Sequence, residues 1–148
     1  MVLFSLADTA VSGSSVDAVF NFEVRLGGDG GDSIGGFAGY NVADSQSTNA
    51  GWIEGGFLLN GSGADTVFNN LQQAISVIES LGADSTKYDL DANEVFLFRV
   101  STDSYIGTTD GTKVTSVVKL VGVGADRASF DLVESSTDGI FYIGPQGG

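Results

Sequence analysis

The feature that most constrains the fold is a pair of long apolar segments joined through a turn signal. Residues 95–100, Val-Phe-Leu-Phe-Arg-Val, are apolar almost throughout and predict a central strand. Residues 104–107 predict its hairpin partner, and residues 114–123 predict a second long strand. Asp110-Gly111 precedes that second strand, and this dipeptide is a frequent turn sequence. An antiparallel sheet is therefore predicted at the centre of the protein.

A further strand is predicted near the N-terminus, because apolar residues alternate with other residues over 16–26. The chain contains 22 glycines but one proline, and small turn-forming residues recur throughout, as is typical of a protein built mainly from strands. The alternation assigns one set of side chains to the buried face of this strand: Val16, Ala18, Phe20, Phe22, Val24 and Leu26.

One amphipathic helix is predicted at about residues 64–81, with Ser62 or Asp65 as its N-terminal cap. Apolar residues there recur at spacings of three and four, which gives one apolar face that we expect to pack on a sheet. These residues are Val67, Leu71, Ala74, Ile75, Ile78 and Leu81. The predicted class is α+β, mainly β, with a β-sandwich or β-roll-like architecture in a single domain over 1–148.

The charge balance and two absent residue types exclude several functions. The chain has 6 Lys and Arg against 19 Asp and Glu, a formal net charge of −13, which disfavours nucleic acid as a partner. It has no histidine and no cysteine, so a Ser-His-Asp triad, a cysteine nucleophile and His or Cys zinc sites are excluded. A pair of carboxylates could still act as in glycosidases. Asp and Glu are so numerous in this chain, however, that finding such a pair does not distinguish an enzyme from other proteins. We therefore predict a protein that is not an enzyme.

No segment of the sequence predicts insertion into a membrane. There is no apolar run of about 18 residues, and the N-terminus lacks the basic and apolar regions of a cleavable signal. The sequence is thus compatible with a cytoplasmic protein, a trimmed one, or one exported without an N-terminal signal.

The first candidate calcium site lies in residues 27–34, Gly-Gly-Asp-Gly-Gly-Asp-Ser-Ile. This segment matches the Gly-Gly-x-Gly-x-Asp-x-apolar pattern of calcium-binding repeats in secreted toxins and adhesins. Glycines let the backbone turn so that carbonyl and carboxylate oxygens converge on an ion, with Asp29 and Asp32 as the candidate ligands. The alternative is a plain Gly/Asp loop between strands.

The second candidate calcium site precedes the central strand. Asp89, Asp91 and Asn93 repeat the first three side-chain positions of an EF-hand loop, and Glu94 could assist them. An EF-hand itself is rejected, because Glu94 takes the sixth position, where glycine is needed, and Val100 takes the twelfth, where a bidentate Glu is needed. Two interpretations of this segment remain: a calcium-binding loop that does not follow the EF-hand pattern, or a solvent-exposed turn that leads into the strand.

Two aromatic residues are candidate platforms for sugar rings, Trp52 and Tyr40. Trp52 is the single tryptophan of the chain and lies in a glycine-interrupted apolar segment. An exposed ring there could stack on a glycan, whereas a lone tryptophan beside a strand is also typical of a core or an interface.

The succession over 94–123 resembles the C-terminal regions of bacterial type I secreted proteins. An acidic loop is followed by Val-Phe-Leu-Phe-x-Val, by Asp-Ser-Tyr-Ile with Asp-Gly, and by Val-Val-Lys-Leu-Val-Gly-Val. The resemblance is to the calcium-binding, repeat-in-toxin class and to the bluetail-like domains of cyanobacterial surface proteins. Residues 16–34 resemble the segment that follows the repeats in that class. The chain departs from the class in having at most two repeat-like units.

The resemblance implies an extracellular or cell-surface bacterial protein exported through its C-terminal end. With the acidic composition, it predicts a calcium-binding structural protein that assembles with copies of itself into a filament, sheath or surface layer, or an adhesive one. The alternative is an extracellular carbohydrate-binding module that binds surface glycans through Trp52 and Tyr40.

Overall fold

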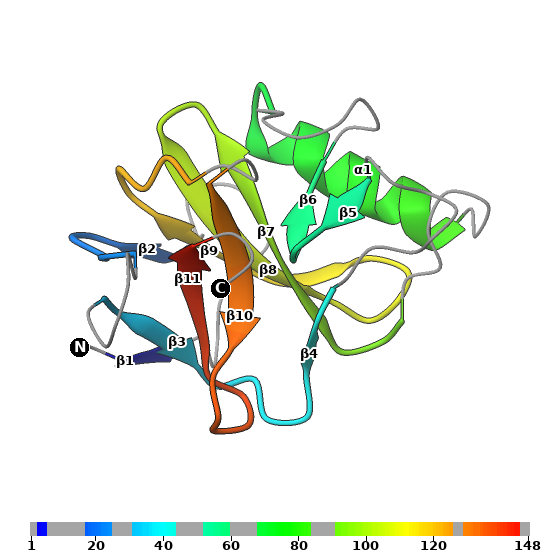
Figure 1. Ribbon diagram of the computed structural model, residues 1–148. Coiled ribbons are helices and arrows are strands. Elements are labelled where there is room, and N and C mark those ends of the chain that lie inside the picture. Colours follow the sequence, from blue (N-terminus) through cyan, green and yellow to red (C-terminus); the bar gives the residue numbers. More distant parts are fainter. Residues whose placement is uncertain are drawn as a thin grey trace.

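The computed structural model describes residues 3–5, 17–24, 31–43, 52–59, 68–83, 91–125 and 129–145 (Figure 1). These residues form one helix and eleven strands. The elements are β1 (Leu3–Ser5), β2 (Asp17–Val19), β3 (Ser33–Gly35), β4 (Asn41–Val42), β5 (Ile53–Glu54), β6 (Phe57–Leu58), α1 (Leu71–Ala83), β7 (Glu94–Val100), β8 (Asp103–Thr109), β9 (Val114–Leu120), β10 (Phe130–Glu134) and β11 (Phe141–Pro145).

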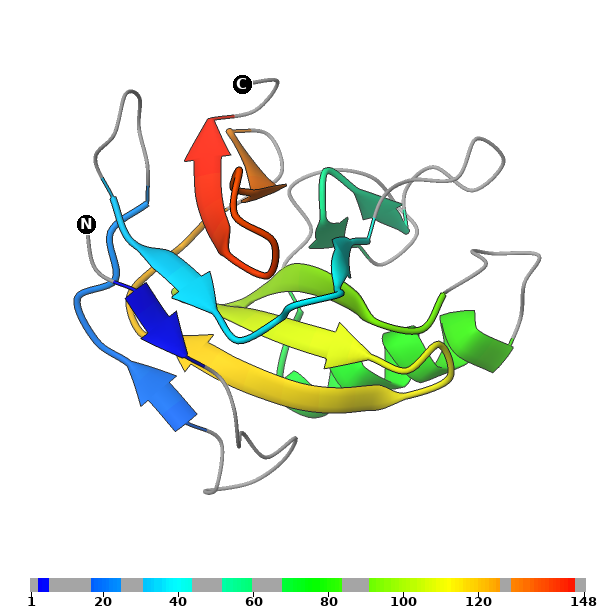
Figure 2. The same cartoon turned by 90° about the horizontal axis from the view of Figure 1, so that it is seen from below.

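Two mixed sheets and the helix form three layers. The smaller sheet has the order β1-β3-β11-β10, and the larger has the order β2-β9-β8-β7-β6-β5, with β4 also paired to β7. Figure 2 shows α1 on one side of β8 and β9 and the β10–β11 hairpin on the other. The described part of the chain is therefore mainly β with a single helix, which confirms the predicted α+β class and takes the form of a β-sandwich.

The first core fills the space between the two sheets. The smaller sheet contributes Ile34, Leu132, Phe141 and Ile143, and the larger contributes Val95, Leu97, Ile106, Val118 and Leu120. Two backbone contacts join the layers at their margins. The Leu132 N–H donates to the Gly55 carbonyl at 2.8 Å, and the Asp32 N–H donates to the Glu23 carbonyl at 2.8 Å.

The second core lies between the larger sheet and α1. Phe96 and Phe98 alternate with the first-core residues along β7, as period-2 geometry requires. The rings of Phe98 and Tyr105 stack at 5.2 Å across the β7–β8 pair. Phe96 faces Gly107 in the same pair, and a Cβ added to that glycine would lie 2.7 Å from the Phe96 Cζ. The absent side chain at Gly107 therefore makes room for the Phe96 ring.

The β8–β9 turn is fixed by the Asp110 carboxylate. Its Oδ1 accepts the Thr112 N–H at 2.9 Å, the Thr112 hydroxyl at 2.9 Å and the Lys113 N–H at 3.0 Å. These hydrogen bonds, from the Thr112 backbone first, lower the pKa of Asp110 from 3.8 to about 2. Gly111 has a φ of 98°, which glycine adopts without steric cost. The predicted Asp-Gly turn is thus confirmed.

A register shift in the β8–β9 pair divides the apolar residues of β9 between the two cores. The shift falls between Thr108 and Thr109. Val114 consequently packs on the helix side, whereas Val118 and Leu120 pack between the sheets.

The predicted strand over 16–26 is wrong in its length, and its predicted buried face is wrong for Ala18 and Phe20 but confirmed for Phe22. β2 covers three residues, pairs in parallel with β9, and ends where Val19 lies opposite Leu120. Asn21, with a φ of 60°, then turns the chain away from the sheet. Val19 packs against the first core, whereas Phe20 is 66% exposed. The pairing of β2 with β9 sets which side chains of β2 face the core. The alternation of apolar residues along the segment does not encode that pairing.

The predicted helix is present, but it begins later than residues 64–81 indicate. It spans 71–83, and residues 64–67 lie outside the described residues. Four of the predicted stripe residues are buried in the second core and a fifth packs against it; these are Ala74, Ile75, Ile78, Leu81 and Leu71. Among the described residues, no helix has the length and apolar character needed to span a bilayer.

A local capping arrangement at Asn70 and a strand-like contact at Phe68 set the start of α1. Phe68 forms a parallel bridge with Val100, so the chain still follows the sheet edge at this point. The Asn70 Oδ1 then accepts the Gln73 N–H at 2.8 Å, and the Gln73 Oε1 accepts the Asn69 N–H at 2.7 Å. These bonds satisfy amides that a first helical turn leaves free.

Candidate functional site

An apolar hollow lies at one end of the sandwich, between the segments that follow β2 and β9. Its volume is about 450 Å³. One wall comes from residues 22–24, the other from residues 122–125, and Phe130 at the start of β10 adds a third side. The described lining residues are Phe22, Glu23, Val24, Gly122, Val123, Gly124, Ala125 and Phe130.

The wall over 22–24 is held by two hydrogen bonds between Glu23 and Asp32. The Glu23 N–H donates to the Asp32 Oδ2 at 2.9 Å, and the Asp32 N–H donates back to the Glu23 carbonyl at 2.8 Å. Phe22 is 6% exposed and belongs to the core between the sheets. The wall is thus joined to the sandwich through both its backbone and its first side chain.

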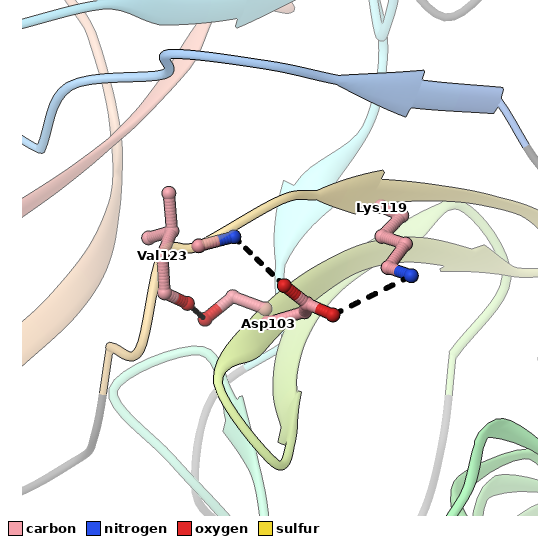
Figure 3. Close-up of polar contacts among 5 residues, drawn as sticks. Asp103, Lys119 and Val123 are labelled. Atoms are coloured by element: carbon pink, nitrogen blue, oxygen red, sulfur yellow. Dashed lines mark hydrogen bonds and ion pairs between the residues drawn. The ribbon is translucent and has the colours of Figure 1, made fainter.

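The opposite wall is held by Asp103, whose contacts Figure 3 shows, and by Ser104, both at the start of β8. The Asp103 Oδ1 accepts the Gly122 N–H at 2.7 Å, and its Oδ2 lies 3.4 Å from the Lys119 Nζ. Ser104, which is fully buried, donates its hydroxyl to the Val123 carbonyl.

The Ser104 oxygen also accepts the Ala125 N–H at 3.2 Å, so one hydroxyl satisfies two backbone groups of this wall. The chain leaving β9 therefore has a defined path beside the hollow.

The chemistry of the hollow suits binding of an apolar group. Glu23 is the single charged residue among the described lining residues, and Phe20, two positions before the wall over 22–24 in the sequence, has 66% of its surface exposed. The Arg99 guanidinium lies behind the opposite wall, with its Cζ 3.6 Å from the position of a Cβ at Gly124.

The described members of the two candidate calcium groups lie on different sheets. Asp32 precedes β3 of the smaller sheet, is 6% exposed, and binds the Glu23 amide. Asp91, Asn93 and Glu94 lie at the start of β7 in the larger sheet. Asp29 and Asp89 lie outside the described residues.

The loop before β7 is held by a hydrogen bond within it and by two backbone hydrogen bonds to neighbouring strands. The Glu94 Oε1 accepts the Asp91 N–H at 3.2 Å, and Glu94 is 8% exposed. Asn93 has a φ of 62°, donates its N–H to the Thr109 carbonyl and accepts the Asn41 N–H. Over the described ranges, no three acidic side chains come together as a metal site.

The two candidate sugar platforms do not lie together. Trp52 is half-buried and packs against the helix-side core, and its carbonyl accepts the Leu59 N–H at 2.7 Å. Tyr40 is half-buried and packs against the core between the sheets, with its ring edge-to-face with Phe37 at 5.8 Å. The rings belong to cores on opposite faces of the larger sheet and do not form one surface.

Sequence reasoning did not identify the hollow. The sequence pattern places Phe20, Phe22 and Val24 together on the buried face of one strand, and 122–123 at the end of another. The hollow exists because both strands end early and their following segments diverge. The sequence carries one signal of that ending, the spaced glycines Gly122 and Gly124.

Comparisons of the chain with protein-family models, with curated proteins and with solved structures found no match. The described residues form a mixed β-sandwich with a hollow, lined largely by apolar residues, at one end.

Proposed function

We propose that the protein is a secreted or cell-surface structural domain of bacterial origin that functions by associating with copies of itself. The apolar hollow and the exposed ring of Phe20 carry this proposal. Apolar surface that stays exposed on a folded domain is typical of protein–protein contacts, where buried aromatic side chains are among the groups that contribute most to binding.

Two features of the chain support a structural rather than a catalytic role. The sequence has neither histidine nor cysteine, and the described lining of the hollow offers one carboxylate. The walls are also fixed by buried or paired contacts, such as those of Ser104 and Asp32. A preformed, rigid surface of this kind loses little conformational entropy when it associates.

Calcium is proposed as a stabilising ion for this domain. The net charge of −13 disfavours the compact state through repulsion, and a bound divalent cation relieves that cost. The resemblance of 94–123 and 16–34 to the type I secreted class supports the same expectation. Asp29 and Asp89, with the other candidate ligands Asp32, Asp91, Asn93 and Glu94, are the residues to test.

Sedimentation velocity over a range of protein concentrations, with calcium and with chelator, tests the proposal. We expect a species larger than the monomer that grows with concentration. Calcium at about 100 times its Kd adds about 2.7 kcal/mol to folding, which raises the Tm by roughly 5–10 °C in a domain of this size. A chain that stays monomeric throughout, with a Tm indifferent to calcium and chelator, contradicts the proposal.

A further inference from the structure

We propose that residues 52–59 form a clasp between the two cores, so that the smaller sheet and α1 separate from the larger sheet together or not at all. The clasp contains the paired strands β5 and β6 and the Gly55-Gly56 turn between them. This coupling is a property of the single chain, so it holds whether or not copies associate.

Neighbouring side chains of the clasp are buried in opposite cores. Phe57 and Leu59 belong to the core between the sheets, whereas Ile53 and Leu58 belong to the core between the larger sheet and α1. All four are at most 3% exposed. Because successive residues of a strand point to opposite faces, the clasp cannot leave one core and keep its place in the other.

The turn of the clasp is bonded to both sheets. The Gly56 carbonyl accepts the Leu97 N–H of β7 at 2.7 Å, and the Gly55 carbonyl accepts the Leu132 N–H of β10 at 2.8 Å. A Cβ added to Gly56 would lie 2.6 Å from the Leu132 Cβ and 2.8 Å from the Val42 Cγ1. The backbone of Gly56 is therefore packed directly against a strand of each sheet.

The clasp is too short to persist without both cores. Its two strands have two residues each, and an isolated hairpin is marginally stable at best in water. Loss of the smaller sheet would uncover Phe57 and Leu59, and loss of α1 would uncover Ile53 and Leu58. Separation of either layer therefore frees the clasp, and release of the clasp opens the other core.

The clasp also covers the edge of β7 that does not pair with β8. Phe57 pairs with Leu97 at the middle of this edge, between β4 at one end and the Phe68 bridge to Val100 at the other. Residues 95–100 are apolar except for Arg99 and include no proline, a composition that pairs readily with other chains when its edge is exposed. A clasp that opens only with the whole fold keeps this edge covered in the native protein.

Two variants of the full chain strain one core each. Gly107→Ala places a Cβ 2.7 Å from the Phe96 Cζ on the helix side, and Gly56→Ala places one 2.6 Å from the Leu132 Cβ between the sheets. Gly122→Ala is the matched control for Gly56→Ala. Its φ of +77° is close to the +81° of Gly56, but a Cβ there would have no atom within 4 Å.

Native-state amide hydrogen exchange at low protein concentration measures the opening of both cores. The Leu132 amide reports on the smaller sheet, and the amides of Ile78 and Leu81 within α1 report on the helix side. In the wild type we expect both sets to have the same opening equilibrium constant and the same urea dependence. Each strained variant should accelerate both sets by the same factor, about 10- to 100-fold, and Gly122→Ala should accelerate them less.

Independent layers give a different result, because the strain on one side then persists when the other side opens. Unchanged exchange at Leu132 in Gly107→Ala, or at Ile78 and Leu81 in Gly56→Ala, overturns the clasp. Wild-type sets that differ in urea dependence overturn it as well, and that comparison needs no variant.

Trp52 provides a second measurement, because the single tryptophan of the chain begins the clasp and packs against the helix-side core. Its fluorescence should change in the same urea transition as the far-UV circular dichroism of the whole chain. A fluorescence change at lower urea shows that the clasp leaves alone and contradicts the coupling.

Discussion

Replacing Gly107 by alanine tests how tightly the helix-side core is packed. A Cβ at this position would lie 2.7, 3.0 and 3.3 Å from three ring atoms of Phe96, where ordinary contact begins at 3.4 Å. The ring is fully buried and stacks on Phe98 at 5.8 Å, so it cannot move toward solvent. Overpacking of a close-packed core costs about 1–3 kcal/mol, and we expect about 2 kcal/mol for Gly107→Ala.

Urea denaturation and a double-mutant cycle measure this effect. A loss of about 2 kcal/mol corresponds to a fall in Tm of roughly 4–8 °C for a domain of this size. Phe96→Leu shortens the opposing side chain, so the double variant should be more stable than the sum of the single losses by about 1 kcal/mol. Gly124→Ala is the control, because its Cβ would meet Arg99 at an ordinary 3.6 Å. A Gly107→Ala variant as stable as the wild type, or strictly additive losses, refutes the reasoning.

Three further predictions concern the turns and the walls of the hollow. Gly139→Ala combines a φ of +82° with a Cβ 2.4 Å from the Ala38 nitrogen, so we expect a loss of about 3 kcal/mol in urea denaturation; an unchanged midpoint contradicts this. Ser104→Ala removes the partner of two backbone groups in 123–125, which should cost about 1–3 kcal/mol and speed amide hydrogen exchange there; unaltered exchange disproves it. The folded-state pKa of Asp110 is about 2 against 3.8, so its contribution to stability is complete above about pH 4 and is lost as pH falls toward 2; a carboxyl NMR titration near 4 would refute it.

The agreement between sequence and structure is best where neighbouring segments pair. The β7–β8–β9 meander follows from the apolar segments over 95–100 and 114–123 and from the Asp110-Gly111 turn, although β9 ends at Leu120. The helix follows from an apolar stripe that repeats at helical spacing. In both cases the signal is local, because each residue's orientation is set by others within a few positions.

The candidate site was not predictable in the same way. Phe20 follows the alternation of a buried strand, yet it is exposed because Val19 pairs with Leu120, about a hundred positions along the chain. Asp32 and Glu94 each lie in a promising acidic sequence, but the topology assigns their segments to different sheets. Pairing between different segments of the chain decided both outcomes, and periodicity within one segment does not encode that pairing.

The sequence by itself determined the strand-rich class, the central hairpin strands, the helix and the strongly acidic surface, since these follow from composition and short-range pattern. Only the tertiary structure decided which face of β2 points outward, where α1 begins, and that the ends of β2 and β9 enclose an apolar hollow. The physical reason is that such features depend on contacts between segments far apart in the chain, whose register is fixed when the sheets pack.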